Sequence, residues 1–248
     1  MVLVVLRHGE SEWNKLNKFT GIMDIPLSEN GHVEAAEAGE ILQNCKFDAI
    51  FTSNLIRTVE TAAMVAQIQS SIVEPVRVLE FQERDYGDLT GKDKTELAEL
   101  YGTDQVKIWR RSYLHGPPNG ENLEQVKMRV SGAYDIFVKP LIDANKNVLI
   151  VAHGNSLRAL FVHLGIKDER SVEQFEIGTG IPIQIDTVRR EYRYENAYKL
   201  SAYQIIDSRG YPSLEVQCID RNTRKCIGKG STPSGASLIL VSLTSGFG

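Results

Sequence analysis

The chain has 248 residues, of which 42% are hydrophobic and 24% are charged, and its formal net charge is −4 at pH 7. This is ordinary globular composition, and the length allows one large domain with or without an appendage. The negative charge argues against nucleic acid or a membrane surface as partner, and no apolar run approaches the roughly 18 residues of a membrane span. An anionic ligand would therefore need a local cluster of basic side chains.

Short apolar runs alternate with longer amphipathic stretches over the first 200 residues, which predicts alternating strands and helices. Strands are expected at 2–6, 48–52, 76–79, 148–152 and 181–186. Helices are expected from about residue 32 to 43 and at 55–68, 122–143 and 155–164, and the segment 192–200 is expected to close the domain. This order predicts an α/β domain with a central, mostly parallel sheet and helices on both faces.

The segment from Glu80 to Gly120 is polar and irregular, with short helices expected near 94–101 and 105–113. A segment of this length between core elements is usually functional or disordered. Its aromatic residues Tyr86, Trp109 and Tyr113 argue against disorder. We therefore expect a small cap over the carboxyl ends of the strands.

Two of the predicted strands end in the same way. Arg7-His8-Gly9-Glu10 follows the first strand, and His153-Gly154-Asn155-Ser156 follows the strand at 148–152. Ligands of open α/β sheets bind at the carboxyl ends of the strands. If the two strands are neighbours, two imidazoles face each other across one crevice. A neutral imidazole is a good nucleophile toward phosphorus, so this pattern indicates phosphoryl transfer.

Phosphoryl transfer also needs positive charge around the phosphate and a proton donor for the leaving oxygen. Glu83 is the candidate donor, although its carboxylate has a simpler interpretation as the ion-pair partner of Arg84. The candidate cations are Arg7, Arg57, Lys94, Arg110 and Arg111. The Arg110-Arg111 pair is also compatible with a solvated helix face. The sequence has no clustered carboxylates or other metal-binding pattern, so no metal is expected.

Taken together, these residues resemble a known family. Arg7-His8-Gly9-Glu10-Ser11-Glu12-Trp13-Asn14 is similar to the signature of cofactor-dependent phosphoglycerate mutases, in the histidine phosphatase superfamily. Further similar segments, in the same order as in that family, lie at 52–58, 83–91, 109–113, 152–158 and 179–182. The resemblance covers about residues 2–200.

The resemblance implies a role for each matching residue. His8 would be the phosphohistidine nucleophile, His153 the stabilising second histidine and Glu83 the acid/base, with Arg7 and Arg57 as further catalytic residues. The implied substrate-binding set is Arg7, Ser11, Asn14, Thr20, Gly21, Arg57, Glu83, Arg84, Tyr86, Lys94, Arg110, Arg111, Gly154 and Asn155.

The activity implied is the interconversion of 3-phosphoglycerate and 2-phosphoglycerate, with 2,3-bisphosphoglycerate as the priming phosphoryl donor and no metal. Two alternatives stay open: a phosphatase of the same superfamily, and a non-catalytic remnant of a mutase–enolase fusion. The partners expected are small phosphoglycerates only. Many family members carry an insertion after Pro118, and this chain lacks it. The short forms of the family also lack it and are often monomeric, so a monomer is favoured over a dimer. Asp93, next to Lys94, also departs from the family and is expected to weaken phosphate binding slightly.

The last part of the chain departs from the mutase pattern. Residues 202–216 resemble the opening of enolase, and 232–237 resemble an early loop of that enzyme. We therefore expect a catalytic domain at 1–200 and an appended tail at 201–248 without catalytic role, folded as a hairpin of strands 204–206 and 214–218. The odd, widely spaced cysteines Cys45, Cys218 and Cys226 indicate reduced thiols. With a first strand that leaves no room for a leader peptide, they predict a cytoplasmic protein.

Overall fold

The computed structural model describes residues 1–194, 198–206, 212–220 and 226–231, with side chains in the first of these ranges. The chain divides into two compact units, Met1–Glu195 and Asn196–Gly248. Each unit is described below by itself. The first contains the elements predicted for the α/β domain, and the second contains only strands.

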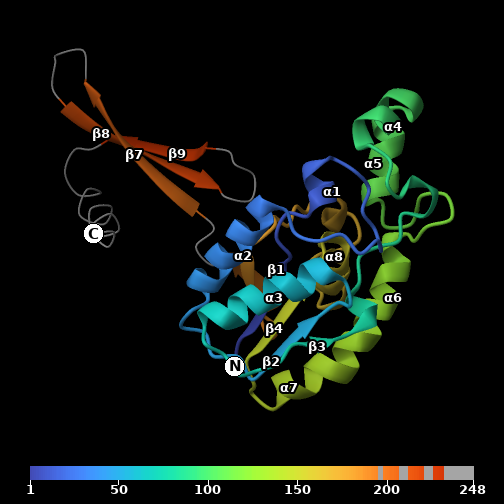
Figure 1. The fold of residues 1–248 in the computed structure, drawn as a ribbon, viewed down its shortest axis with the longest axis horizontal. Helices are drawn as coiled ribbons and strands as arrows, with labels where there is room; N and C mark the ends of the chain where they lie inside the picture. Colours follow the sequence, from blue (N-terminus) through green and yellow to red (C-terminus); the bar gives the residue numbers. More distant parts are fainter. Residues whose placement is uncertain (195–197, 207–211, 221–225, 232–248) are drawn as a thin grey trace. The chain divides into compact units, whose positions relative to one another are not determined.

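The first unit is built on a six-stranded sheet, in the order β3-β2-β4-β1-β5-β6. β1, β2, β3 and β4 are labelled in Figure 1. Its strands are β1 (Leu3–Arg7), β2 (Ala49–Thr52), β3 (Val76–Arg77), β4 (Val148–Ala152), β5 (Pro182–Asp186) and β6 (Glu191–Tyr194). β1, β2, β3 and β4 are mutually parallel, whereas β5 runs antiparallel to β1 and β6 antiparallel to β5. The predicted mostly parallel sheet is confirmed. Because β1 and β4 are paired neighbours, His8 and His153 emerge side by side at one edge.

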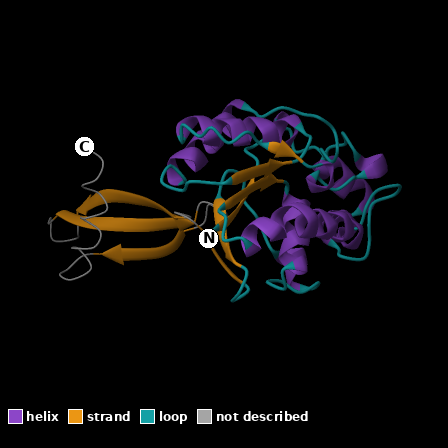
Figure 2. Cartoon of the chain, turned by 90° about the horizontal axis from the view of Figure 1, so that it is seen from below, coloured by secondary structure: helices purple, strands orange, loops and turns teal. Residues whose placement is uncertain are grey.

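Helices cover both faces of this sheet, as predicted (Figure 2). α2 (Glu29–Ile41) and α3 (Ile56–Ile68) share a core with Val4 and Leu6 of β1. α6 (Leu123–Ala133) and α8 (Gly154–His163) share a second core with Leu3 and Val5. Alternate residues of β1 thus enter opposite cores, which explains why this strand reads as a continuous apolar run. None of the helices in the described part of the chain combines the length and apolarity that crossing a membrane requires.

The long helix predicted at 122–143 is not continuous. α6 is followed by a turn of π-helix, η3 (Tyr134–Val138), and then by α7 (Lys139–Asp143). Pro140 lies in the first turn of α7. Proline has no N–H to donate to the preceding turn and its ring crowds that turn, so the helix widens there instead of continuing regularly.

The predicted cap consists of α4 (Lys94–Tyr101) and α5 (Thr103–Arg111), preceded by the short turns η1 (Leu79–Phe81) and η2 (Gly87–Leu89). It has a small core of its own, in which Leu97 and Val106 pack against Phe19 and Leu89, with Trp109 alongside. Both predicted cap helices are therefore present, and α5 is displaced by two residues from its expected range. Two further short elements, α1 (Glu12–Lys15) and η4 (Ser171–Gln174), were not predicted.

The second unit contains a three-stranded antiparallel sheet in the order β7-β8-β9, formed by β7 (Tyr198–Ile206), β8 (Pro212–Asp220) and β9 (Cys226–Ser231). The predicted hairpin is present, with Gln204 opposite Leu214, but its strands are longer than expected and a third strand is added. The residues 207–211 and 232–237 lie outside the described residues. The segment expected to close the domain, 192–200, does so only in part: β6 is the last strand of the first sheet and ends at Tyr194, and β7 belongs to the other sheet.

Candidate active site

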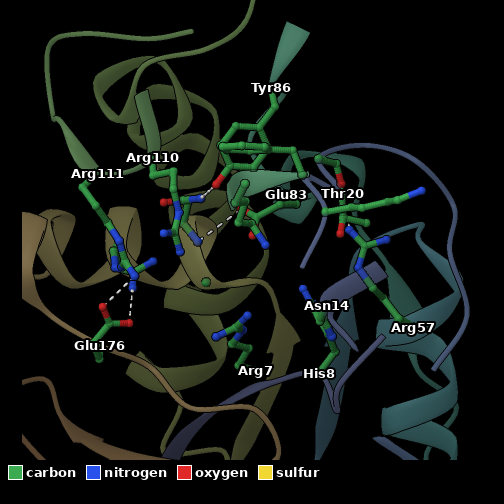
Figure 3. A pocket seen from close by; sticks show the side chains of 17 residues that line it. Arg7, His8, Asn14, Thr20, Arg57, Glu83, Tyr86, Arg110, Arg111 and Glu176 are labelled. Carbon is green, nitrogen blue, oxygen red and sulfur yellow. Dashed lines mark hydrogen bonds and ion pairs between the residues drawn. The ribbon is translucent and has the colours of Figure 1, made fainter. Parts of the chain in front are cut away.

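A cavity of about 200 Å³ lies at the carboxyl ends of β1 and β4, with residues of the cap on its wall (Figure 3). Seven of its lining side chains are arginine or lysine and two are carboxylates. In the described part of the chain, no three His, Cys, Asp or Glu side chains converge in a way that would hold a metal ion. The lining residues are Arg7, His8, Asn14, Lys18, Phe19, Thr20, Gly21, Arg57, Glu83, Tyr86, Lys94, Arg110, Arg111, Gly154, Asn155, Arg158 and Glu176.

His8 follows β1 and is 3% exposed. Its Nδ1 lies 2.6 Å from the carbonyl oxygen of Gly9. A carbonyl only accepts, so Nδ1 carries the proton and Nε2 keeps its lone pair. Burial, followed by the charges of Arg57 and Arg7, holds the pKa of His8 well below its usual value. The imidazole is therefore neutral near pH 7, with Nε2 free to act as a nucleophile.

The loop that carries His8 is fixed by a close approach of two backbones. A Cβ on Gly9 would lie 2.2 Å from the carbonyl oxygen of Gly31, and a Cβ on Gly31 would lie 2.0 Å from that of Glu10. Only glycine fits at both positions. The Ser28 hydroxyl also donates to the Glu10 carboxylate at 2.7 Å. The loop is thereby held against the start of α2.

His153 is fully buried, and its ring lies 4.9 Å from that of His8, centroid to centroid, at 62°. Its Nε2 is 2.8 Å from the Ser53 hydroxyl, which is 2.9 Å from that of Thr58. Thr58 donates its one proton to the Leu55 carbonyl, so Ser53 donates to Thr58 and accepts from His153 Nε2. Nδ1 has no hydrogen-bond partner among the described residues. Burial is the largest cause that lowers the pKa of His153.

Two arginines, Arg57 and Arg7, line the floor of the cavity, and the protein holds them in place. Arg57 is 1% exposed, and its two terminal nitrogens each donate to a carbonyl, of Gly21 and Met23, at 2.8 Å. Burial lowers the pKa of Arg57 to about 10, so it stays protonated at neutral pH. Nε of Arg57, Nε of Arg7 and Oγ1 of Thr20 are buried without hydrogen-bond partners among the described residues. Unpaired buried donors are costly, and an anion in the cavity would pair them.

Glu83 lies on the cavity wall, where its Oε1 accepts from the backbone N–H groups of Arg84 at 2.8 Å and Asn155 at 3.2 Å. Asn155 is in the first turn of α8, where a carboxylate is favourable, and its side chain donates to the Tyr86 hydroxyl. It is the backbone of Arg84, not its guanidinium, that contacts Glu83. The fully buried guanidinium lies 5.0 Å from the Tyr86 ring centroid and donates to the Trp109 carbonyl.

The cap contributes three cations to the cavity. Lys94 is the first residue of α4, and Arg110 and Arg111 are the last two residues of α5. Burial, followed by the charge of Arg110, lowers the pKa of Lys94 to about 8. Arg111 pairs with Glu176 at 2.6 Å. Arg110 and Arg111 both line the cavity, so the alternative of a solvated helix face is wrong for this pair. The Asp93 carboxylate accepts two backbone N–H groups as the N-cap of α4, which explains an acidic residue there.

Residues 3–196 match the family model of the histidine phosphatase superfamily, branch 1. The chain belongs to this superfamily. The 2,3-bisphosphoglycerate-dependent phosphoglycerate mutase of Bartonella tribocorum is 46% identical over 185 residues, which cover 73% of this chain and 89% of the relative. The enzyme of the same name from Chlamydia muridarum is 40% identical over 216 residues, 77% of this chain and 96% of the relative. The cofactor-dependent mutases are thus homologues over most of this chain.

Solved structures share the fold of the first unit. The α-ribazole phosphatase of Shigella flexneri is 26% identical, with a TM-score of 0.64 over 79% of this chain and 96% of that one. A mycobacterial glucosyl-3-phosphoglycerate phosphatase in complex with VO3 is 24% identical, with a TM-score of 0.67 over 78% of this chain and 96% of that one. These likenesses support the mutase-like histidine phosphatase fold predicted from the sequence.

Most residues singled out in the sequence are brought to the cavity wall, but three are not. His153 lies against the ring of His8 and is not itself part of the lining. Arg84 is buried behind Tyr86, and Ser11 is the N-cap of α1, bonded to Asn14. The cavity is also lined by Lys18, Phe19 and Glu176, for which no role was predicted. Lys18 and Phe19 adjoin the matched Thr20-Gly21 segment, whereas Glu176 carried no signal in the sequence.

Proposed function

We propose that this protein is a phosphoglycerate mutase that interconverts 3-phosphoglycerate and 2-phosphoglycerate through a phosphohistidine at His8. Curated relatives at 38–46% identity carry the name 2,3-bisphosphoglycerate-dependent phosphoglycerate mutase. The observation that carries the proposal is the neutral His8 imidazole, with Nε2 free, in a cavity lined by seven arginine or lysine side chains. A cavity with this charge suits a substrate with a phosphate and a carboxylate.

2,3-Bisphosphoglycerate supplies the phosphoryl group that charges His8. The unpaired buried donors of Arg7, Arg57 and Thr20 suit such a polyanion. In turnover, the bond between phosphorus and Nε2 of His8 breaks as the substrate hydroxyl oxygen bonds to phosphorus, and Glu83 takes the hydroxyl proton. In the return step Nε2 attacks the other phosphate, and Glu83 gives the proton back to the leaving oxygen.

The remaining groups hold charge and position. Arg7, Arg57 and Asn14 bind the transferring phosphoryl group, together with the backbone around Thr20-Gly21, and His153 stabilises it from beside His8. Guanidiniums supply the neutralisation that a metal provides in other phosphoryl-transfer enzymes. The cap residues Tyr86, Lys94, Arg110 and Arg111, with Gly154 and Asn155, bind the rest of the substrate. Ser11 and Arg84 act indirectly, by holding Asn14 and Tyr86.

A phosphatase activity of the same site is the second candidate. It is favoured by the solved relatives with this fold, because the two described above are named phosphatases. In that case water accepts the phosphoryl group from His8. The cap favours the mutase, because its cations would retain a doubly phosphorylated intermediate while it is reoriented.

A coupled assay separates the two activities. Purified protein is given 3-phosphoglycerate with and without 2,3-bisphosphoglycerate, in the presence of a chelator, and both 2-phosphoglycerate and inorganic phosphate are measured. We expect 2-phosphoglycerate to form only with the primer, and activity to survive chelation. Release of phosphate without 2-phosphoglycerate would reject the mutase in favour of the phosphatase.

We further infer that the first unit, Met1–Glu195, is the catalytic domain, and that the tail after it derives from the start of an enolase and has no catalytic role. Its resemblance to enolase stops before any catalytic residue of that enzyme. We also propose a monomer, supported by the missing insertion after Pro118. A cytoplasmic location is proposed as well, because charged phosphoglycerates do not cross membranes unaided.

A further inference from the structure

Two backbone carbonyls of one short segment, 175–177, hold arginines of the cavity. The Phe175 carbonyl accepts from Nε of Arg158 at 2.7 Å, and the Ile177 carbonyl accepts from Nη1 of Arg7 at 2.7 Å. Backbone carbonyls thus hold one nitrogen of each of these two guanidiniums.

The Glu176 carboxylate bridges two arginines. Its Oε1 lies 2.6 Å from Nη2 of Arg111, and its Oε2 lies 3.3 Å from Nη2 of Arg158. The side chain of Glu176 is 53% exposed, against 18% for Arg111 and 5% for Arg158. The anion can thus swing toward water, whereas its two cationic partners are enclosed.

Glu176 also lies at a particular end of the cavity. Figure 3 shows Glu176 and Arg111 on one side, with Arg57 and Thr20 on the other. A phosphoryl group at His8 lies near Arg57, so a single small anion bound there does not contact Glu176. A second anionic group on the same ligand extends toward the cap, where it meets guanidiniums already paired with Glu176.

We propose that Glu176 is a specificity-determining residue, an internal anion that a ligand's second anionic group must displace from Arg111 and Arg158. The displaced carboxylate turns to solvent, and the incoming carboxylate or phosphate takes its place on the guanidiniums. The class of ligand affected is therefore one with two separated anionic groups. The choice of 3-phosphoglycerate as that ligand rests on the proposed function.

The size of the effect follows from the exposure of the pair. Ion pairs that are partly open to water contribute little, so removing the competing charge should strengthen binding of a two-anion ligand by about two- to fivefold. The direction of the change in affinity distinguishes a competing carboxylate from one that only positions the arginines. If Glu176 served only to position the arginines, its removal would weaken binding instead.

The test compares Glu176→Gln with Glu169→Gln by calorimetric titration. Glu169 is an exposed carboxylate outside the cavity, so its variant makes the same change in net charge elsewhere. Each protein is titrated with inorganic phosphate and with 3-phosphoglycerate. We expect Glu176→Gln to bind 3-phosphoglycerate about two- to fivefold more tightly, to bind phosphate within twofold of wild type, and Glu169→Gln to change neither.

Unchanged or weaker binding of 3-phosphoglycerate by Glu176→Gln would overturn the proposal, and so would equal tightening of both ligands. Phosphate binding by Glu176→Gln also shows whether the cavity of this variant is intact. If Glu176→Gln no longer binds phosphate, the same titrations are carried out with Glu176→Ala. Because calorimetry needs no turnover, an absence of mutase activity in the wild type would reject the proposed function without bearing on this result.

Discussion

The floor and the cap of the cavity hold their charged groups in different ways. On the floor are His8 and Arg57, with His153 against the ring of His8; they are 3%, 1% and 0% exposed, and carbonyls and a buried hydroxyl hold them in place. In the cap, Arg110 and Arg111 close α5 and are only partly buried, and Arg111 is held by a half-exposed carboxylate.

Under the proposed function, this difference divides the residues that act on phosphorus from those that bind the rest of the ligand. The groups proposed to contact phosphorus lie at the ends of strands and in the first turn of a helix, where backbone fixes them. The groups proposed to bind the rest of the ligand lie on a small layer with its own core. Variants of the floor should therefore lower turnover, and variants of the cap should lower affinity.

Glu83→Gln tests the acid/base next to the floor. We expect kcat to fall by about 10²- to 10⁴-fold with a small change in KM, because an amide keeps the shape but cannot exchange the proton. Steady-state kinetics with 3-phosphoglycerate measure the split. A change confined to KM would make Glu83 a positioning residue.

His153→Ala removes the second imidazole of the floor. The expected loss is about 10²- to 10³-fold in kcat, the usual effect of removing one preorganised group that stabilises developing charge. Circular dichroism should show an intact fold. A rate near that of wild type would reduce His153 to a structural partner of Ser53.

Arg110→Ala tests the cap. A charge-assisted hydrogen bond contributes about 1.5–3 kcal/mol, so KM should rise by about 10- to 100-fold while kcat stays within a few-fold. The defect should be largest at low salt, since salt screens the interaction that the variant has lost. Kinetics at two ionic strengths, with Arg110→Lys as the charge-conserving control, measure this. A fall in kcat at unchanged KM would contradict the division between floor and cap.

Truncation after Leu200 should have the smallest effect. The proposed catalytic groups lie in the first unit, so activity should remain within about twofold, and the full-length protein should not dehydrate 2-phosphoglycerate. Both reactions are followed by absorbance in coupled assays. Poor binding of 2,3-bisphosphoglycerate by the truncated protein would instead give the tail a part in closing the site.

The floor was accessible from the sequence because it follows from local rules. A β-branched run that ends in His-Gly places a histidine at a strand end, and two such runs in a parallel sheet place two together. The cap cations were predictable as candidates, but only the structure separates lining residues from the buried Arg84. Glu176 was out of reach, because its pairing with Arg111 joins segments 65 residues apart. The third strand of the tail was missed because its Gly-rich sequence has little strand propensity.

The central claim is that His8 alone carries the phosphoryl group. The most direct measurement is incubation of wild type and His8→Ala with 2,3-bisphosphoglycerate labelled in its phosphates, followed by counting of acid-labile label on the protein. We predict label on wild type that is stable to base, lost in acid and transferred to 3-phosphoglycerate, and none on His8→Ala. Comparable acid-labile label on the variant would contradict the account.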